Sequence, residues 1–167
     1  DGGGECGKRI VNEWETLVVC AGDHHNIGSD TGELAGVEAQ NVEIESDLAT
    51  ALRETRAEVA VDFSVPSAVR ANIQIMLDAG VCPVVGTTGL GEKDLKEIDE
   101  MAREADVPVF IAPTFSVGAV LMMRFAAQCA EYFDFAEILE FHHEKKLAAP
   151  SGTASHTAPF LREAKGK

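Results

Sequence analysis

The chain has 167 residues with 14 basic and 28 acidic side chains, a formal net charge of −14, and 46% hydrophobic against 25% charged residues. This balance is typical of a folded globular protein, and the acidic excess without any Lys/Arg cluster argues against nucleic-acid binding. We expect neither a membrane span nor a secretory leader, because no apolar run approaches the roughly 20 residues that cross a bilayer. The four cysteines follow no CxxC or paired spacing, which favours reduced thiols and neither disulfides nor a metal site.

Short apolar runs alternate with amphipathic patterns over the first two thirds of the chain. Runs rich in β-branched residues predict strands at 17–21, 59–63, 81–85 and 107–112, each buried on both faces. Helices are predicted around Ile10 to Trp14 and over 47–56, the latter capped by Ser46. Two stronger apolar stripes predict further helices: Val69, Ile73, Met76 and Leu77, closed by a left-handed Gly80, and then Leu95, Ile98, Met101 and Ala102. This alternation predicts an α/β fold, a Rossmann-like parallel sheet with helices on both faces.

The pattern changes after Ala112. Residues 113–116 interrupt it, and 117–130 are apolar nearly all round, which predicts a helix buried on most sides. A strand over 136–141 and a helix that begins at Ser151-Gly152-Thr153 are expected to follow. We therefore predict a boundary near 113–117 and the start of a second, incomplete α+β domain.

Candidate ligand-binding residues of the first domain lie where strands end, because ligands of open parallel sheets gather there. The glycines at 2–7 precede a helix and would let backbone N–H groups approach a pyrophosphate, although a simple glycine-rich terminus is the alternative. Asp23 follows strand 17–21, the usual place of a carboxylate that binds ribose hydroxyls. The run Gly86 to Gly89 follows strand 81–85 and suits either a planar ring or an ordinary βα turn.

The second candidate site begins at His142-His143 with Lys146 and continues to Ser151-Gly152-Thr153. The two hydroxyls and the free N–H groups of a helix start suit a carboxylate. A lysine adds positive charge, and a histidine carries a proton near neutral pH. The alternative is a solvated charged loop followed by a capped helix.

At these residues the sequence resembles the dihydrodipicolinate reductase (4-hydroxy-tetrahydrodipicolinate reductase) family of the diaminopimelate route to lysine. The matching segments are 30–36 (DTGELAG), 61–63 (VDF), 85–89 (VGTTG), 115–118 (FSVG), His142-His143 with Lys146, and 149–154 (APSGTA). The resemblance implies a reductase of a small dicarboxylate that uses NADH or NADPH. A metal is not expected, because the His24-His25 pair has no Cys or acidic ligand at fixed spacing. It implies a dinucleotide-binding domain over 1–113, the start of a substrate-binding and tetramerisation domain over 114–167, and a cytoplasmic or plastid homotetramer as the complete protein.

Site roles follow from the resemblance by position. His142 would be the proton donor and Lys146 the residue that stabilises the substrate. The substrate carboxylate would be held by His143, Ser151, Gly152 and Thr153. The cofactor would contact Gly4, Gly7, Asp23, Gly86, Thr87, Thr88, Ala112 and Phe115. Asp23 favours NADH because a carboxylate repels a 2′-phosphate, whereas a protonated His24 would offset that repulsion.

The sequence departs from the family pattern at three positions and in extent. Asp1 stands in place of the first glycine, Thr114 in place of asparagine, and Ala148 in place of aspartate. We expect the family's first strand and most of the second domain's sheet to be missing, which leaves a gap between strands 17–21 and 59–63 and a marginally stable, poorly active chain. A non-catalytic dinucleotide-binding relative and another amino-acid-pathway dehydrogenase remain as alternatives.

Overall fold

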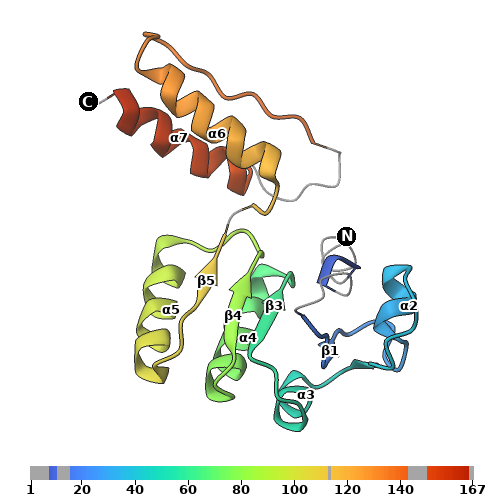
Figure 1. The fold of residues 1–167 in the computed structure, drawn as a ribbon. Coiled ribbons are helices and arrows are strands. Elements are labelled where there is room, and N and C mark those ends of the chain that lie inside the picture. The colour runs from blue at the N-terminus through green and yellow to red at the C-terminus, as the bar shows by residue number, and fades with distance from the viewer. Residues whose placement is uncertain (1–7, 11–15, 113, 143–149, 166–167) are drawn as a thin grey trace. The chain divides into compact units, whose positions relative to one another are not determined.

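The structure, a computed structural model, describes residues 8–10, 16–112, 114–142 and 150–165. The chain divides into two compact units, residues 1–111 and 112–167 (Figure 1). The predicted helix around Ile10 to Trp14 extends into residues outside the described ranges.

Unit 1 is built on parallel strands joined by helices. Strands β1 (Ala21–Gly22) and β2 (Ile44–Glu45) pair in parallel, and helices α2 (Thr31–Ala35) and α3 (Leu48–Glu54) follow them in turn. Strands β3 (Val59–Asp62), β4 (Cys82–Val85) and β5 (Phe110–Ile111) form a second parallel sheet in chain order, connected by α4 (Pro66–Asp78) and α5 (Glu92–Ala105) (Figure 1). The predicted α/β class, parallel sheets flanked by helices, is confirmed.

The two sheets are separate, as the sequence predicts, but the bounds of the strand predicted over 17–21 are wrong, because residues 17–20 form no strand. Strand β1 pairs with β2 and not with β3, and it is only two residues long. Strand β2 was not predicted, because two residues are too few to carry an alternation signal. The predicted cap of α3 is wrong: the helix begins one residue later, and the Asp47 carboxylate accepts the Ala49 N–H at 3.1 Å in place of Ser46.

The core of unit 1 lies between the three-stranded sheet and α4. Val69, Ile73 and Leu77 of α4 pack with Val85 of β4 and Ile98 of α5, and each is at most 3% exposed. Burial of one such aliphatic side chain contributes about 1.5–3 kcal/mol. The apolar stripe of α4 therefore fixes the helix against the sheet, as its spacing predicts.

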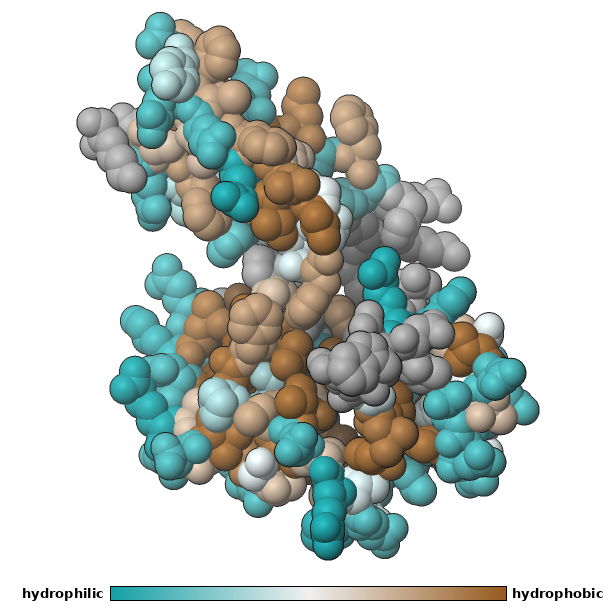
Figure 2. Space-filling view, in the orientation of Figure 1, coloured by the Kyte–Doolittle hydropathy of each residue, from teal (hydrophilic) through white to brown (hydrophobic). Residues whose placement is uncertain are grey.

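The other face of this sheet is exposed. Val61, Val84 and Phe110 lie opposite one another in the strand register and so share a face, and Val61 and Phe110 are 39% and 58% exposed. Hydrophobic side chains gather over these strands in Figure 2. The prediction that strands 59–63 and 107–112 are buried on both faces is thus wrong for the described residues, because α4 and α5 cover the same side.

In the described part of unit 2, two helices pack against each other, α6 (Val117–Ala130) and α7 (Gly152–Lys165). The bounds of α6 match the prediction, but its burial does not: only Met123 and Ala130 are buried, while Val117 is 73% exposed. The predicted strand over 136–141 is absent, because no strand among the described residues pairs with it. Within the described ranges, no helix has both the length and the apolar character that a bilayer crossing needs.

Candidate active site

The first cluster lies at the carboxyl ends of β3 and β4 and centres on Asp62, which is 5% exposed. Its Oδ1 accepts the Ser64 N–H at 2.7 Å and the Thr87 hydroxyl at 3.1 Å, and its Oδ2 accepts Asn72 Nδ2 at 2.8 Å. One carboxylate thus joins the turn after β3, helix α4 and the loop after β4.

The 86–89 loop lies tightly against the 63–66 turn. A Cβ on Gly86 would come within van der Waals overlap of the Phe63 ring, so this close approach requires glycine. Gly89 has a φ of +95°, in the left-handed region, with Pro66 Cγ 3.2 Å from an added Cβ. The predicted flat loop therefore has a physical basis: an aromatic ring on one side and glycines where side chains would intrude.

The side chains of Thr87 and Thr88 differ in exposure. Thr87 is 6% exposed, and its hydroxyl lies 3.1 Å from both Asp62 Oδ1 and the Ser64 carbonyl oxygen, inside the protein. Thr88 is exposed. Of the two hydroxyls predicted to contact a cofactor, the structure therefore presents that of Thr88 at the surface.

Asp23 directly follows β1, as its sequence position indicates. Its Oδ1 accepts the N–H groups of His24 at 2.6 Å and His25 at 3.2 Å, and His25 Nδ1 lies 3.5 Å away. Burial raises the pKa of Asp23, but these hydrogen bonds from His25 and His24 outweigh it and hold the pKa below its ordinary value. The carboxylate is an anionic acceptor, which suits ribose hydroxyls and disfavours a phosphate.

The second cluster belongs to unit 2 and contains a carboxylate that sequence reasoning missed. Glu140 Oε2 lies 3.0 Å from His142 Nε2, and its Oε1 accepts the Ser151 N–H at 2.8 Å. The Ser151 hydroxyl accepts the Ala154 N–H at 3.0 Å and caps α7. Alternate residues of an extended segment point the same way, so the spacing of Glu140 and His142 was the available signal.

Hydrogen bonds from the Ser151 side chain, His142 and the Ser151 N–H lower the pKa of Glu140 to about 2. The carboxylate therefore stays ionised and keeps an acceptor beside the imidazole. It occupies the N-terminus of α7, where Ser151 is predicted to hold a substrate carboxylate.

The remaining predicted site residues are placed as follows. Gly152 and Thr153 form the first turn of α7, where the Thr153 carbonyl oxygen accepts the Thr157 hydroxyl at 2.7 Å. Ala112 is half-buried and Phe115 is 48% exposed. The predicted residues Gly4, Gly7, His143 and Lys146 lie outside the described ranges.

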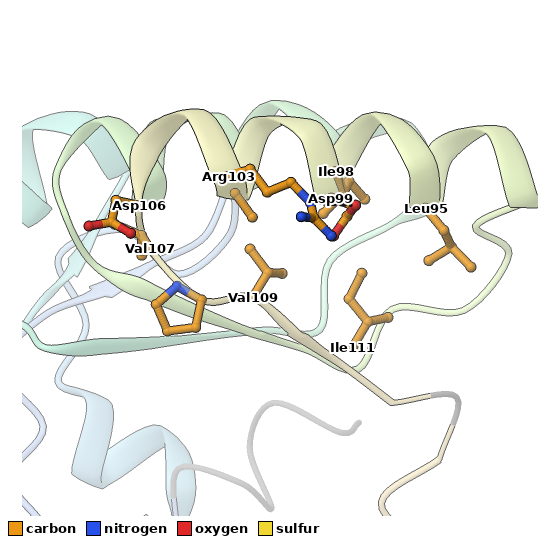
Figure 3. Close-up of a pocket in the computed structure, with 10 residues that line it drawn as sticks. Leu95, Ile98, Asp99, Arg103, Asp106, Val107, Val109 and Ile111 are labelled. Carbon is orange, nitrogen blue, oxygen red and sulfur yellow. Dashed lines mark hydrogen bonds and ion pairs between the residues drawn. The ribbon is translucent and has the colours of Figure 1, made fainter.

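A groove of about 590 Å³ runs between α5 and residues 106–111 (Figure 3). Aliphatic side chains such as Leu95, Val109 and Ile111 line it, together with the ion pair of Asp99 and Arg103, 2.9 Å apart. Its lining contains no histidine, cysteine, serine or threonine and does not include the strand-end cluster around Asp62. In the part of the chain that the structure describes, no group of three or more His, Cys, Asp or Glu side chains could hold a metal ion.

Comparison with known proteins decides the family. Residues 2–115 match the family described as "Dihydrodipicolinate reductase, N-terminus", and residues 118–167 match "Dihydrodipicolinate reductase, C-terminus". The chain belongs to the dihydrodipicolinate reductase family. The resemblance inferred from the sequence motifs is therefore confirmed.

The names of individual relatives agree with this assignment to the dihydrodipicolinate reductase family. The 4-hydroxy-tetrahydrodipicolinate reductase of Desulfitobacterium hafniense (strain Y51) is 45% identical over 166 residues, which cover 96% of this chain and 62% of the relative. That of Moorella thermoacetica is 42% identical over 159 residues, 95% of this chain and 60% of the relative. The chain thus spans less than two thirds of the length of these relatives.

A solved structure supports the Rossmann-like fold. A dipicolinate-bound dihydrodipicolinate reductase from Paenisporosarcina sp. TG-14 superposes with a TM-score of 0.74 at 33% identity, and the match covers 98% of this chain and 63% of that chain.

Proposed function

We propose that the chain carries the nucleotide-binding part and the proton-donating part of an NAD(P)H-dependent 4-hydroxy-tetrahydrodipicolinate reductase. The observation that carries the proposal is the match to both family regions, 2–115 and 118–167, in a chain whose His142 lies beside the N-terminus of a helix. The division after Ile111 supports a dinucleotide-binding domain over 1–113 and a substrate domain that begins at 114. The family resemblance supports a homotetramer of the cytoplasm or plastid stroma as the complete enzyme.

The residues at the strand ends fit a pyridine nucleotide. Gly86 presents main chain without a side chain, the Thr87 hydroxyl is turned inward, and Thr88 is exposed, which leaves a flat surface for a planar ring. Asp23 is ionised and suits the adenosine ribose. We propose NADH as the preferred form, because Asp23 repels a 2′-phosphate. When bound, the cofactor supplies the hydride.

His142 supplies the proton in this mechanism. In the imidazolium form of His142, Glu140 accepts the Nε2–H and fixes the ring orientation, and the Nδ1–H is the proton that we assign to transfer, which leaves a neutral imidazole. The N-terminal turn of α7, with Ser151, Gly152 and Thr153, binds a carboxylate of the substrate through its N–H groups. Glu140 then has to give up its bond to the Ser151 N–H when the substrate enters. Lys146 and His143 are proposed to add charge on the strength of the resemblance.

The test is turnover of 4-hydroxy-tetrahydrodipicolinate, measured with NADH and with NADPH as the loss of absorbance of the reduced nicotinamide. We expect His142→Gln to lower kcat by about 10²–10⁴, the usual contribution of a general acid, while NADH affinity stays unchanged. Nucleotide binding without turnover, both in this chain and in a chain extended to the length of its relatives, would identify a non-catalytic relative. Activity on aspartate- or homoserine-pathway substrates, with His142→Gln harmless, would identify another dehydrogenase.

A further inference from the structure

Asp62 is a buried carboxylate whose partners are all neutral. Within the described chain it forms no ion pair, and its hydrogen-bond donors are a backbone N–H, a side-chain amide and a hydroxyl. Both carboxylate oxygens accept hydrogen bonds, because donors from three segments converge on this side chain at the end of β3. The backbone adds a further link, since the Asp62 carbonyl oxygen accepts the Gly86 N–H at 2.8 Å.

Thr87 is the contact between this carboxylate and the 86–89 loop. Its single hydroxyl proton has two acceptors at 3.1 Å, Asp62 Oδ1 and the Ser64 carbonyl oxygen, and both lie on the inner side of the loop. Thr87 as a whole is only 6% exposed, and its hydroxyl proton is directed to these acceptors and not to a ligand. Its effect on a bound molecule therefore passes through the main chain of its neighbours, Gly86 and Thr88.

We propose that Asp62 is a positioning residue that acts through Thr87 to fix the 86–89 loop as the platform for the nicotinamide ring. This inference rests on the proposed function for the identity of the ring. Loss of the Thr87 hydroxyl leaves Phe63, Pro66 and the Gly86 N–H bond in place but removes the side-chain bond between the loop and the Asp62 carboxylate. The platform then loses its fixed geometry while the ribose contact at Asp23 remains.

The experiment compares the binding of NADH with the binding of ADP-ribose. Both probes contain the adenosine half, but only NADH carries the nicotinamide ring. We expect Thr87→Val, which removes only the hydroxyl, to weaken NADH binding by about five- to tenfold, the equivalent of one hydrogen bond, with ADP-ribose affinity unchanged. Thr87→Ser keeps the hydroxyl and is expected to retain NADH affinity. Thr55→Val is the matched control, because its hydroxyl bonds the Ala51 carbonyl oxygen at 2.9 Å, at the end of α3.

A double-mutant cycle tests the part played by Asp62. Asp62→Asn should weaken NADH binding, and its addition to Thr87→Val should weaken binding little further, because the two residues act through one bond. Equal losses for NADH and ADP-ribose, or no loss in Thr87→Val, would overturn the proposal. If the unchanged chain binds neither probe, the nucleotide-binding function itself is wrong.

Discussion

At the scale of single residues, Glu140 shows how one carboxylate connects two predicted functional groups. It bonds His142 through one oxygen and the capping residue Ser151 through the other. The sequence predicted His142 and Ser151 as site residues from their chemical type and spacing. It did not predict Glu140, because the contact with Ser151 spans 11 positions and depends on where the chain returns to α7.

Acid titration should reveal the contribution of Glu140 to the stability of the fold. The pKa of Glu140 is lowered from 4.5 to about 2 in the folded chain, so its ionised form stabilises unit 2 above about pH 4.5 and that contribution is lost as the pH falls towards 2. Glu140→Gln should remove this part of the pH dependence. Thermal unfolding of both chains across the range measures it.

Glu163→Gln is the matched control for Glu140→Gln, because Glu163 is exposed on α7. It should leave the acid response of the chain unchanged. An identical acid response in Glu140→Gln and in the unchanged chain would contradict the two bonds of Glu140.

At the scale of elements, helix α4 was predictable because its signals are local. Its four stripe residues are all buried, and its end follows from Gly80, which has a φ of +70°. The Gly80 N–H donates to the Leu77 carbonyl oxygen and the Val81 N–H to the Met76 carbonyl oxygen, each at 2.9 Å. These two bonds form a Schellman motif, which stops the helix and turns the chain into β4.

Substitution of Gly80 measures how much its left-handed conformation at the helix end matters for the free energy of unfolding. Nothing lies within 4 Å of an added Cβ, so the cost of Gly80→Ala comes from the left-handed backbone alone. We expect a loss of about 1 kcal/mol in the free energy of unfolding, read from denaturant titration. Gly80→Asn should lose less, because asparagine tolerates this conformation. Equal losses in the two variants would argue against a conformational cause.

Burial of whole elements was less predictable than their positions. The bounds of α6 follow from its apolar run and its Ser116 cap, yet most of its side chains are exposed. Val61 and Phe110 likewise belong to predicted strands but lie on an open face. An apolar run indicates that a segment can be buried, whereas actual burial depends on what the rest of the fold places against it.

At the scale of the whole molecule, the dominant electrostatic property is the net charge of −14. The ion pairs that Arg and Lys side chains form in unit 1 do little to offset it. Arg70–Glu97, Lys93–Glu97 and Arg103–Asp99 each include a side chain that is at least 57% exposed, and such pairs contribute about 0–1 kcal/mol. Self-repulsion of the acidic excess should therefore outweigh local attraction.

Added salt distinguishes the two effects. Screening shortens the reach of exposed charges to about 10 Å at 0.1 M salt, so it relieves the summed repulsion more than it weakens pairs in contact. We expect the Tm to rise by a few degrees from low to moderate NaCl.

Glu104→Lys, at an exposed position in the last turn of α5, should raise the low-salt Tm and flatten its salt dependence, because it removes two units of negative charge and favours the helix dipole. Lys93→Glu adds the same two units of negative charge and should steepen the salt dependence. A Tm that falls with salt would mean that the ion pairs, and not the acidic excess, control stability.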